Sequence, residues 1–257
     1  MTDKTKSSTT QQYPSEIIDL PTGGKLYGKD HPLASVKIEI KYMTAREEDI
    51  LTSANLIKQG IVIDKLLDSL ILTEGVSCDD LFLGDKNAVM IAARILAYGA
   101  EYAVEISDPG TGDTFKHTFD LSDLPYRNMD VLSEIKENAF VIELPVSKNK
   151  VTVKILNGKD EKDINQELKA LEKVGTSREV TTRLKKCVIA VDGDNDINLI
   201  STFVDNMLSR DSFFLRERLV DLVPDIEMIQ EVEFPSGDRR EMSIPMDVTF
   251  FWPSARI

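Results

Sequence analysis

The segment VKIEIKYMTAREEDIL, residues 36–51, contains two different hydrophobic repeats. Its first half alternates Val, Ile and Ile with charged residues, which is the pattern of a β-strand with one face in water. The second half opens with Thr44 and places Glu47 three residues later, a capping box that marks the start of an α-helix. The segment therefore predicts a strand over 36–41 and a helix over 44–59.

Apolar residues at helical spacing continue on the C-terminal side of this segment. They predict helices over 62–71 and 84–98, the second of which ends at Gly99 because glycine favours helix termination. On the N-terminal side, residues 17–20 lead into the turn residues Pro21, Thr22, Gly23 and Gly24. The first third of the chain is expected to be a compact helical cluster behind a strand.

Short β-prone runs on either side of turn residues predict three antiparallel hairpins. The expected strand pairs are 102–107 with 115–121, 140–145 with 151–156, and 228–234 with 241–248. Further helices are expected over 158–175, 197–208 and 213–223, and a helix that passes into a short strand is expected near 184–191. The predicted fold class is α+β, a helical cluster with several small antiparallel β-hairpins.

The chain divides into three expected regions. Residues 1–16 are rich in Ser, Thr, Gln and Lys, and have too little apolar surface to offset the entropy lost on ordering, so they predict a disordered arm. Residues 17–128 are expected to hold the strand, the helical cluster and the first hairpin. Residues 129–257 are expected to form an α+β region that ends in a C-terminal hairpin, with the boundary near 124–138.

Composition excludes several classes of function. The 257 residues include 44 Asp or Glu and 31 Lys or Arg, which gives a formal net charge of -13. Nucleic-acid binding requires clustered cations, so a bulk nucleic-acid binder is not expected. No run of about 18 apolar residues is present, so no membrane span is expected. Two cysteines and a polar N-terminus without an apolar core predict a reducing compartment and no secretory signal.

Two polar motifs resemble known ligand sites, but each lacks part of the pattern that such a site requires. The alternating carboxylates of 192–196 have Ile197 and Phe203 where a calcium loop requires Gly and Glu, so a turn with Asp196 capping a helix is favoured. Thr22-Gly23-Gly24-Lys25 lacks the spacing of a phosphate-binding loop and is interpreted as a tight turn. No cofactor and no metal are expected.

Hydrolytic catalysis would need a base next to a nucleophile. The only histidines are His31, which precedes a proline in a loop, and His117, in a charged hairpin strand. We expect surface or structural roles for both, and buried or half-buried roles for Cys78 and Cys187. Ser147 begins a Ser-x-x-Lys pattern, but a hairpin loop and the lack of a Lys-Thr-Gly partner argue against a lactamase-type site. The chain is not expected to be an enzyme.

The C-terminal stretch Phe250-Phe251-Trp252-Pro253 concentrates aromatic residues, including the only tryptophan. Such a cluster either fills the protein's own core or anchors a partner, because aromatic rings supply a large contact area at low entropic cost. The core arrangement is slightly favoured. Phe250, Phe251 and Trp252 remain candidates for partner binding.

Two predicted hairpins echo each other. Residues 105–120 and 231–247 both run from a strand, through a turn that contains Pro, Gly and Asp, into a second strand. On the residues alone convergence is the favoured explanation, because hairpin turns select Pro, Gly and Asp.

Seven stretches share their residues and spacing with one known family. They are PTGGKLY at 21–27, HPLA at 31–34, KYMTAREEDIL at 41–51, KLLDS at 65–69, GDKNA at 84–88, AARI at 92–95 and FFWP at 250–253. Together they resemble the baseplate hub protein family of T-even-type tailed bacteriophages. The resemblance extends from about residue 18 to the end and is densest before residue 105.

This resemblance implies a structural or assembly component of the central hub of a contractile tail baseplate, without catalytic residues. It implies contacts with other phage baseplate or tail hub proteins, assembly in the host cytoplasm and a place in the virion tail baseplate. Two alternatives stay open, a tail-associated hydrolase or peptidase and a transient assembly chaperone absent from the virion. Copy number, homo-oligomer formation and partner identity also stay open.

Many relatives in that family carry a Cys-x-x-Cys knuckle in two hairpin turns. Here those turns read Asp108-Pro109-Gly110-Thr111 and Phe234-Pro235-Ser236-Gly237, which excludes a thiolate-based metal site at both. The resemblance makes two degenerate knuckle-like hairpins the preferred explanation of the internal echo. Pro109 and Pro235 in these turns are therefore added to the candidates for partner binding.

Overall fold

The computed structural model describes residues 13–134, 137–173, 175–246 and 248–251. Its small antiparallel sheets and its helices confirm the α+β class. The expected disordered arm lies mainly outside these residues. The predicted end of the arm at residue 16 is wrong, because Ser15 and Glu16 belong to strand β1 (Ser15–Asp19). This strand pairs antiparallel with β2 (Lys37–Lys41), which aligns the apolar residues Ile18 and Ile38.

The helical cluster consists of α1 (Ala45–Leu51), α2 (Ala54–Gln59), α3 (Val62–Leu70) and α4 (Leu83–Tyr98). The capping box is confirmed, since Thr44 donates from its backbone N–H (2.9 Å) and its hydroxyl (2.6 Å) to the Glu47 carboxylate. The single helix expected over 44–59 is wrong, because the chain breaks between α1 and α2. There the Thr52 hydroxyl donates to the carbonyl oxygens of Glu48 and Asp49, and Ser53 is extended.

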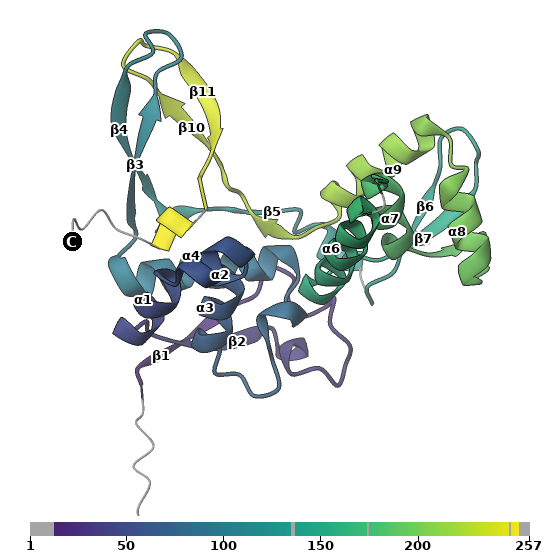
Figure 1. Ribbon diagram of the computed structural model, residues 1–257, viewed down its shortest axis with the longest axis horizontal. Helices are drawn as coiled ribbons and strands as arrows, with labels where there is room; N and C mark the ends of the chain where they lie inside the picture. The colour runs from purple at the N-terminus through teal and green to yellow at the C-terminus, as the bar shows by residue number, and fades with distance from the viewer. Residues whose placement is uncertain (1–12, 135–136, 174, 247, 252–257) are drawn as a thin grey trace, which may run out of the picture.

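Two hairpins form the second part of the molecule. Strands β3 (Glu101–Ser107) and β4 (Thr114–Asp120) pair along their whole length, as do β10 (Ile229–Glu233) and β11 (Arg239–Ser243). Figure 1 shows the two hairpins side by side, projecting together from the helical cluster. We call these four strands and their turns the double hairpin.

A three-stranded sheet with four helices forms the third part. The predicted pair β6 (Phe140–Glu143) and β7 (Lys150–Val153) gains a third strand, β8 (Val188–Val191). The four helices of this part are α6 (Gly158–Lys173), α7 (Glu179–Cys187), α8 (Ile197–Asp205) and α9 (Ser209–Asp221). Figure 1 places this part on the opposite side of the molecule from the double hairpin.

Short elements connect the three parts. The sequence did not predict the pairing of β5 (Tyr126–Arg127) with β9 (Asp225–Ile226), two strands about one hundred positions apart in the chain. The remaining short helices are α5 (Val131–Glu134) and the 3-10 turns Pro32–Ser35, Cys78–Asp80, Leu121–Asp123 and Val248–Phe251.

Glycines allow the helices to approach these connections closely. A Cβ atom on Gly84 would lie 2.0 Å from the carbonyl oxygen of Pro224, so the start of α4 packs directly on the backbone before β9. A Cβ atom on Gly158 would lie 3.0 Å from the backbone of Asp79, so the start of α6 also packs against a 3-10 turn, though less closely.

The buried apolar residues form two cores. The first joins the helical cluster to the double hairpin and to Phe250 and Phe251, so it takes residues from both halves of the chain. The second fills the space between β6–β8 and the helices α7–α9 and reaches Leu26 and Phe82. The C-terminal hairpin thus shares a core with the helical cluster, and the division at residues 128 and 129 stays a prediction.

Candidate partner-binding surface

Apolar contacts hold the two hairpins against each other. Ile106 and Phe119 of the first hairpin are buried together with Val232 and Phe234 of the second. The rings of Phe115 and Phe234 meet edge to face, with centroids 5.5 Å apart. Since an isolated two-stranded hairpin is at best marginally stable in water, each hairpin supplies the other with an apolar face.

Hydrogen bonds lock the two turns together at the tip. The carboxylate of Asp108 accepts from the backbone N–H of Ser236 (2.9 Å), the hydroxyl of Ser236 (2.9 Å) and the backbone N–H of Gly110 (2.7 Å). Asp108 is only 1% exposed. One carboxylate therefore joins turns that lie 128 positions apart in the sequence.

The hydrogen bonds also set the charge of this carboxylate. Burial alone would raise the pKa of Asp108, but donation from Gly110, Ser236 and Thr111 outweighs it, and the pKa is lowered. The group is therefore ionised at neutral pH, and charged acceptors make the stronger hydrogen bonds.

The two turns lie so close together that a side chain at Gly110 would crowd the opposite turn. A Cβ atom on Gly110 would lie 3.0 Å from Cβ of Ser236 and 3.2 Å from the Asp108 carboxylate. Gly112 and Gly237 adopt positive φ angles of 79° and 88°, which glycine adopts without strain. The turn residues thus specify a fixed tip.

Pro109 and Pro235 are both exposed, and each is adjacent to a residue of this junction. The structure thus brings these two candidates together on one tip. The sequence did not identify Asp108 and Ser236 as the residues that join the turns. The internal echo of the two turns was the only signal that could have suggested it.

The aromatic candidates lie elsewhere. Phe250 and Phe251 are completely buried in the first core, and the Phe250 ring meets Tyr102 edge to face at 5.0 Å. In this structure both side chains fill the protein's own core, the arrangement that the sequence slightly favoured, and partner binding by them stays a prediction. Trp252 lies outside the described residues.

The side chains considered for catalysis are engaged structurally. Nδ1 of His31 accepts from the backbone N–H of Leu33 (3.2 Å), and its ring stacks on Tyr27 at 5.0 Å. The His117 ring lies edge to face with Phe119, with centroids 4.6 Å apart. Burial raises the pKa of both Cys78 and Cys187 to about 12, which keeps these thiols protonated at neutral pH.

The tight turn expected at Thr22 to Lys25 is confirmed. Gly23 and Gly24 have positive φ angles, and a Cβ atom on Gly24 would lie 2.8 Å from the Leu33 carbonyl oxygen. Thr22 donates from its N–H (3.0 Å) and its hydroxyl (2.8 Å) to the buried carboxylate of Asp85. Backbone and side chain of this turn are therefore committed to internal contacts.

The acidic stretch 192–196 also has the expected structural role. Oδ1 of Asp196 accepts from the N–H of Leu199 (2.9 Å) and so caps α8. Asp192 holds the β6–β7 loop by accepting from Asn149 and from the N–H of Lys150. Within the described part of the chain, no group of three or more His, Cys, Asp or Glu side chains is arranged to hold a metal ion.

Comparison with known proteins identifies the family. Comparisons with curated proteins and with solved structures gave no match. Within the described ranges, no helix is long and apolar enough to cross a bilayer. The model of the family described as T4 bacteriophage base plate protein matches residues 13–251, a range that includes every described residue. The chain therefore belongs to the T4 bacteriophage base plate protein family.

Proposed function

We propose that this protein is a non-enzymatic component of the central hub of a contractile tail baseplate, and that it acts through contacts with other tail proteins. The observation that carries the proposal is the family match over residues 13–251. The hub assignment rests on the sequence stretches that resemble hub proteins. On this proposal the chain is made in the host cytoplasm and is then built into the virion tail.

The double hairpin supports a role in protein contacts. It projects from the helical cluster (Figure 1), and its two turns are fixed by the Asp108 carboxylate. A surface that is rigid before binding loses less conformational entropy when a partner docks. Pro109 and Pro235, exposed on this tip, are the residues that we propose contact the partner.

Pull-downs with the phage's other tail and baseplate proteins test this proposal. We expect the wild-type chain to bind at least one of them, and Pro235→Glu to weaken that binding because it places a charge on the tip. Gln166→Glu is the matched control, since it adds the same charge on the exposed surface of α6. A chain that binds none of these proteins, and whose deletion leaves tails intact, would contradict the proposed function.

A further inference from the structure

A groove on the third part of the molecule has no role in the proposed tip contact. Its volume is about 520 Å³, and it lies between α7 and α9, with residues 154–156 and the starts of α4 and α6 completing its walls. Its apolar lining includes Leu83, Ile155, Leu184, Leu219, Val220 and Val223. Cavities of this size and character commonly bind ligands or side chains of partners.

Several apolar side chains of the groove are open to solvent. Leu83 is 55% exposed, Val180 41% and Val220 57%. Phe213, seven positions before Val220 on α9 and also largely exposed, extends the same helix face. A patch of exposed apolar residues with a polar rim is typical of a surface that binds another protein.

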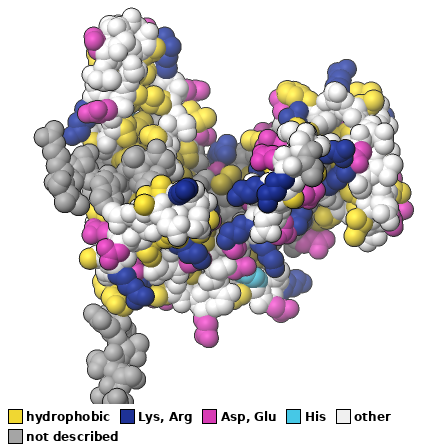
Figure 2. Space-filling model, in the orientation of Figure 1, with side chains coloured by type: hydrophobic (Ala, Val, Ile, Leu, Met, Phe, Trp, Pro, Cys, Tyr) yellow, Lys and Arg dark blue, Asp and Glu magenta, His cyan; other side chains and the backbone are white. Residues whose placement is uncertain are grey.

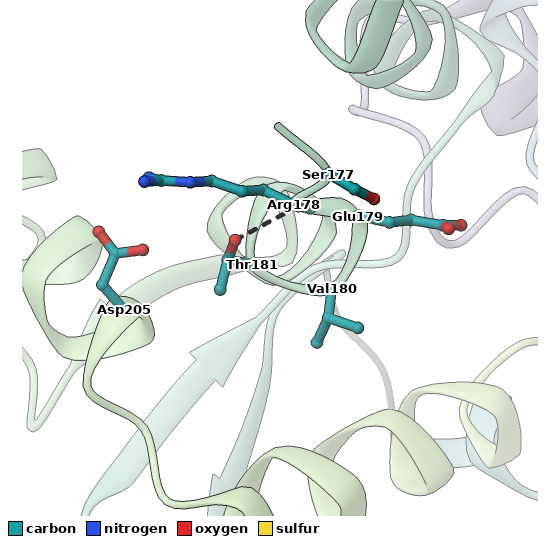
Figure 3. A pocket seen from close by; sticks show the side chains of 6 residues that line it. All are labelled: Ser177, Arg178, Glu179, Val180, Thr181 and Asp205. Atoms are coloured by element: carbon teal, nitrogen blue, oxygen red, sulfur yellow. Dashed lines mark hydrogen bonds between the residues drawn. The ribbon is translucent and has the colours of Figure 1, made fainter. Parts of the chain in front are cut away.

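A second pocket adjoins the groove and shares Glu179 and Val180 with it. Figure 3 shows the first turn of α7 there, with Arg178 and Glu179 extending in opposite directions and Val180 pointing away from both. The Thr181 hydroxyl donates to the Arg178 carbonyl oxygen (3.3 Å) and stabilises this turn. Of these three side chains, Glu179 and Val180 also line the groove.

Charged side chains also line the groove. Four cationic side chains line it, and three of them pair with carboxylates: Arg127 with Asp225, Lys154 with Asp160 and Arg183 with Glu161. The cationic residues are Arg127, Lys154, Arg183 and Arg216. Figure 2 shows Lys and Arg side chains gathered in the middle of the view, over α6 and beside β5. Arg216, the remaining cation of the lining, favours an anionic group on the partner.

Two of these guanidinium groups have unused hydrogen-bonding capacity. Arg216 donates to the carbonyl oxygen of Ser212 and lies over the Phe213 ring, and no carboxylate within the described residues forms an ion pair with it. Arg127 pairs with Asp225 at 3.2 Å, but its buried Nε has no hydrogen-bond partner in the described structure. Guanidinium groups bind carboxylates through paired N–H donors.

From this geometry we propose that the groove between α7 and α9 binds a segment of another tail protein that carries apolar side chains flanked by Asp or Glu. The apolar side chains cover Val180 and Val220, and a carboxylate pairs with Arg216. The inference rests on the proposed function, since it requires partners in the tail. It adds a binding site separate from the double hairpin.

An array of overlapping 15-residue peptides that covers the phage's other tail proteins tests the groove. We expect the peptides that bind the wild-type chain to contain apolar residues with at least one Asp or Glu. Binding of these peptides by Arg216→Glu and by Val220→Asp should weaken about ten-fold or more, the equivalent of about 1.4 kcal/mol. Arg210→Glu is the matched control, because it makes the same charge change on α9 outside the groove lining.

Thermal unfolding of each variant checks that it folds, and Arg216→Gln replaces Arg216→Glu if the latter does not. The proposal would be overturned if every peptide bound the groove variants as well as it bound Arg210→Glu, or if the bound peptides were basic or uncharged. Self-association of the wild-type chain that Arg216→Glu abolishes would also overturn it. Groove variants that assemble into normal tails, while Pro235→Glu does not, would reject the groove and leave the proposed function intact.

Discussion

The buried carboxylate of Asp85 is the residue at which pH should affect stability most directly. It is fully buried, accepts from Thr22 and from the Tyr27 hydroxyl (2.5 Å), and lies near Asp225. Burial raises its pKa from 3.8 to about 6 despite these hydrogen bonds. The folded protein therefore binds this proton more tightly than the unfolded chain, so ionisation of Asp85 costs stability as pH rises from about 4 to 6.

Replacing Asp85 by Asn removes this titration and keeps the size of the side chain. Between pH 4 and 6, the free energy of unfolding should fall by a few kcal/mol more for the wild-type chain than for Asp85→Asn. The size of the effect follows because one pKa unit corresponds to about 1.4 kcal/mol. Urea unfolding at several pH values measures this difference. Parallel pH profiles of the two proteins would contradict the role assigned to Asp85.

Phe250 tests the assignment of the C-terminal aromatics to the core. Because its ring is completely buried against Tyr102 and Phe251, Phe250→Ala should lower the free energy of unfolding by about 3–5 kcal/mol. Phe213→Ala is the control, since Phe213 is 55% exposed and its loss should change stability by no more than about 0.5 kcal/mol. Equal effects of the two substitutions in urea unfolding would show that Phe250 does not fill the core.

Among the helices and strands, the sequence predicted those that are determined by a short local pattern of residues. The strand before Thr44, its capping box and the three hairpins are confirmed, because alternation and cap chemistry act over a few residues. The break after Leu51 was not predicted, because helical apolar spacing resumes beyond Thr52 and Ser53, while the Thr52 hydroxyl competes for the helix backbone. The β5–β9 pair was not predicted because two-residue strands carry no periodicity.

For the two candidate surfaces, the sequence likewise predicted the local turns but not the contacts between distant segments. The sequence identified both hairpin turns, and their contact through Asp108 depends on the long-range fold. The groove depends on four helices whose apolar residues each appear ordinary in sequence. Only the structure shows that Val180 and Val220 face the same groove while Arg216 lacks an ion-pair partner in the described part of the chain.

Helix α4 contacts the backbone before β9 at Gly84, and this contact predicts that Gly84→Ala lowers stability, although helix propensity alone predicts the reverse. Alanine stabilises a helix by about 1 kcal/mol relative to glycine, so propensity alone would make Gly84→Ala stabilising. Because its Cβ would lie 2.0 Å from the Pro224 carbonyl oxygen, we expect destabilisation of about 1–3 kcal/mol instead.

Gly28→Ala is the control for this prediction, because no atom lies within 4 Å of its Cβ position. It should leave the midpoint of thermal unfolding nearly unchanged. A Gly84→Ala variant as stable as Gly28→Ala would show that α4 does not rest on this backbone.

For the whole molecule, the charge distribution predicts how association responds to salt. The chain carries a net charge of -13, while Arg216 in the groove between α7 and α9 is a cation without an ion pair among the described residues. Both arrangements attract surfaces of opposite charge, and salt screens such attraction between exposed groups. The affinity for tail partners should therefore fall as NaCl is raised from 50 to about 500 mM in a binding titration. An affinity that does not change would mean that the charges serve solubility alone.

Mass spectrometry of purified particles tests the central claim most directly. If the protein is a structural component of the baseplate, its peptides should be present in intact virions and enriched in isolated baseplates relative to heads. A transient assembly chaperone would instead appear in infected cells and be lost from finished particles. Absence of the chain from purified virions and baseplates, with other baseplate proteins detected in the same samples, would contradict the proposed role.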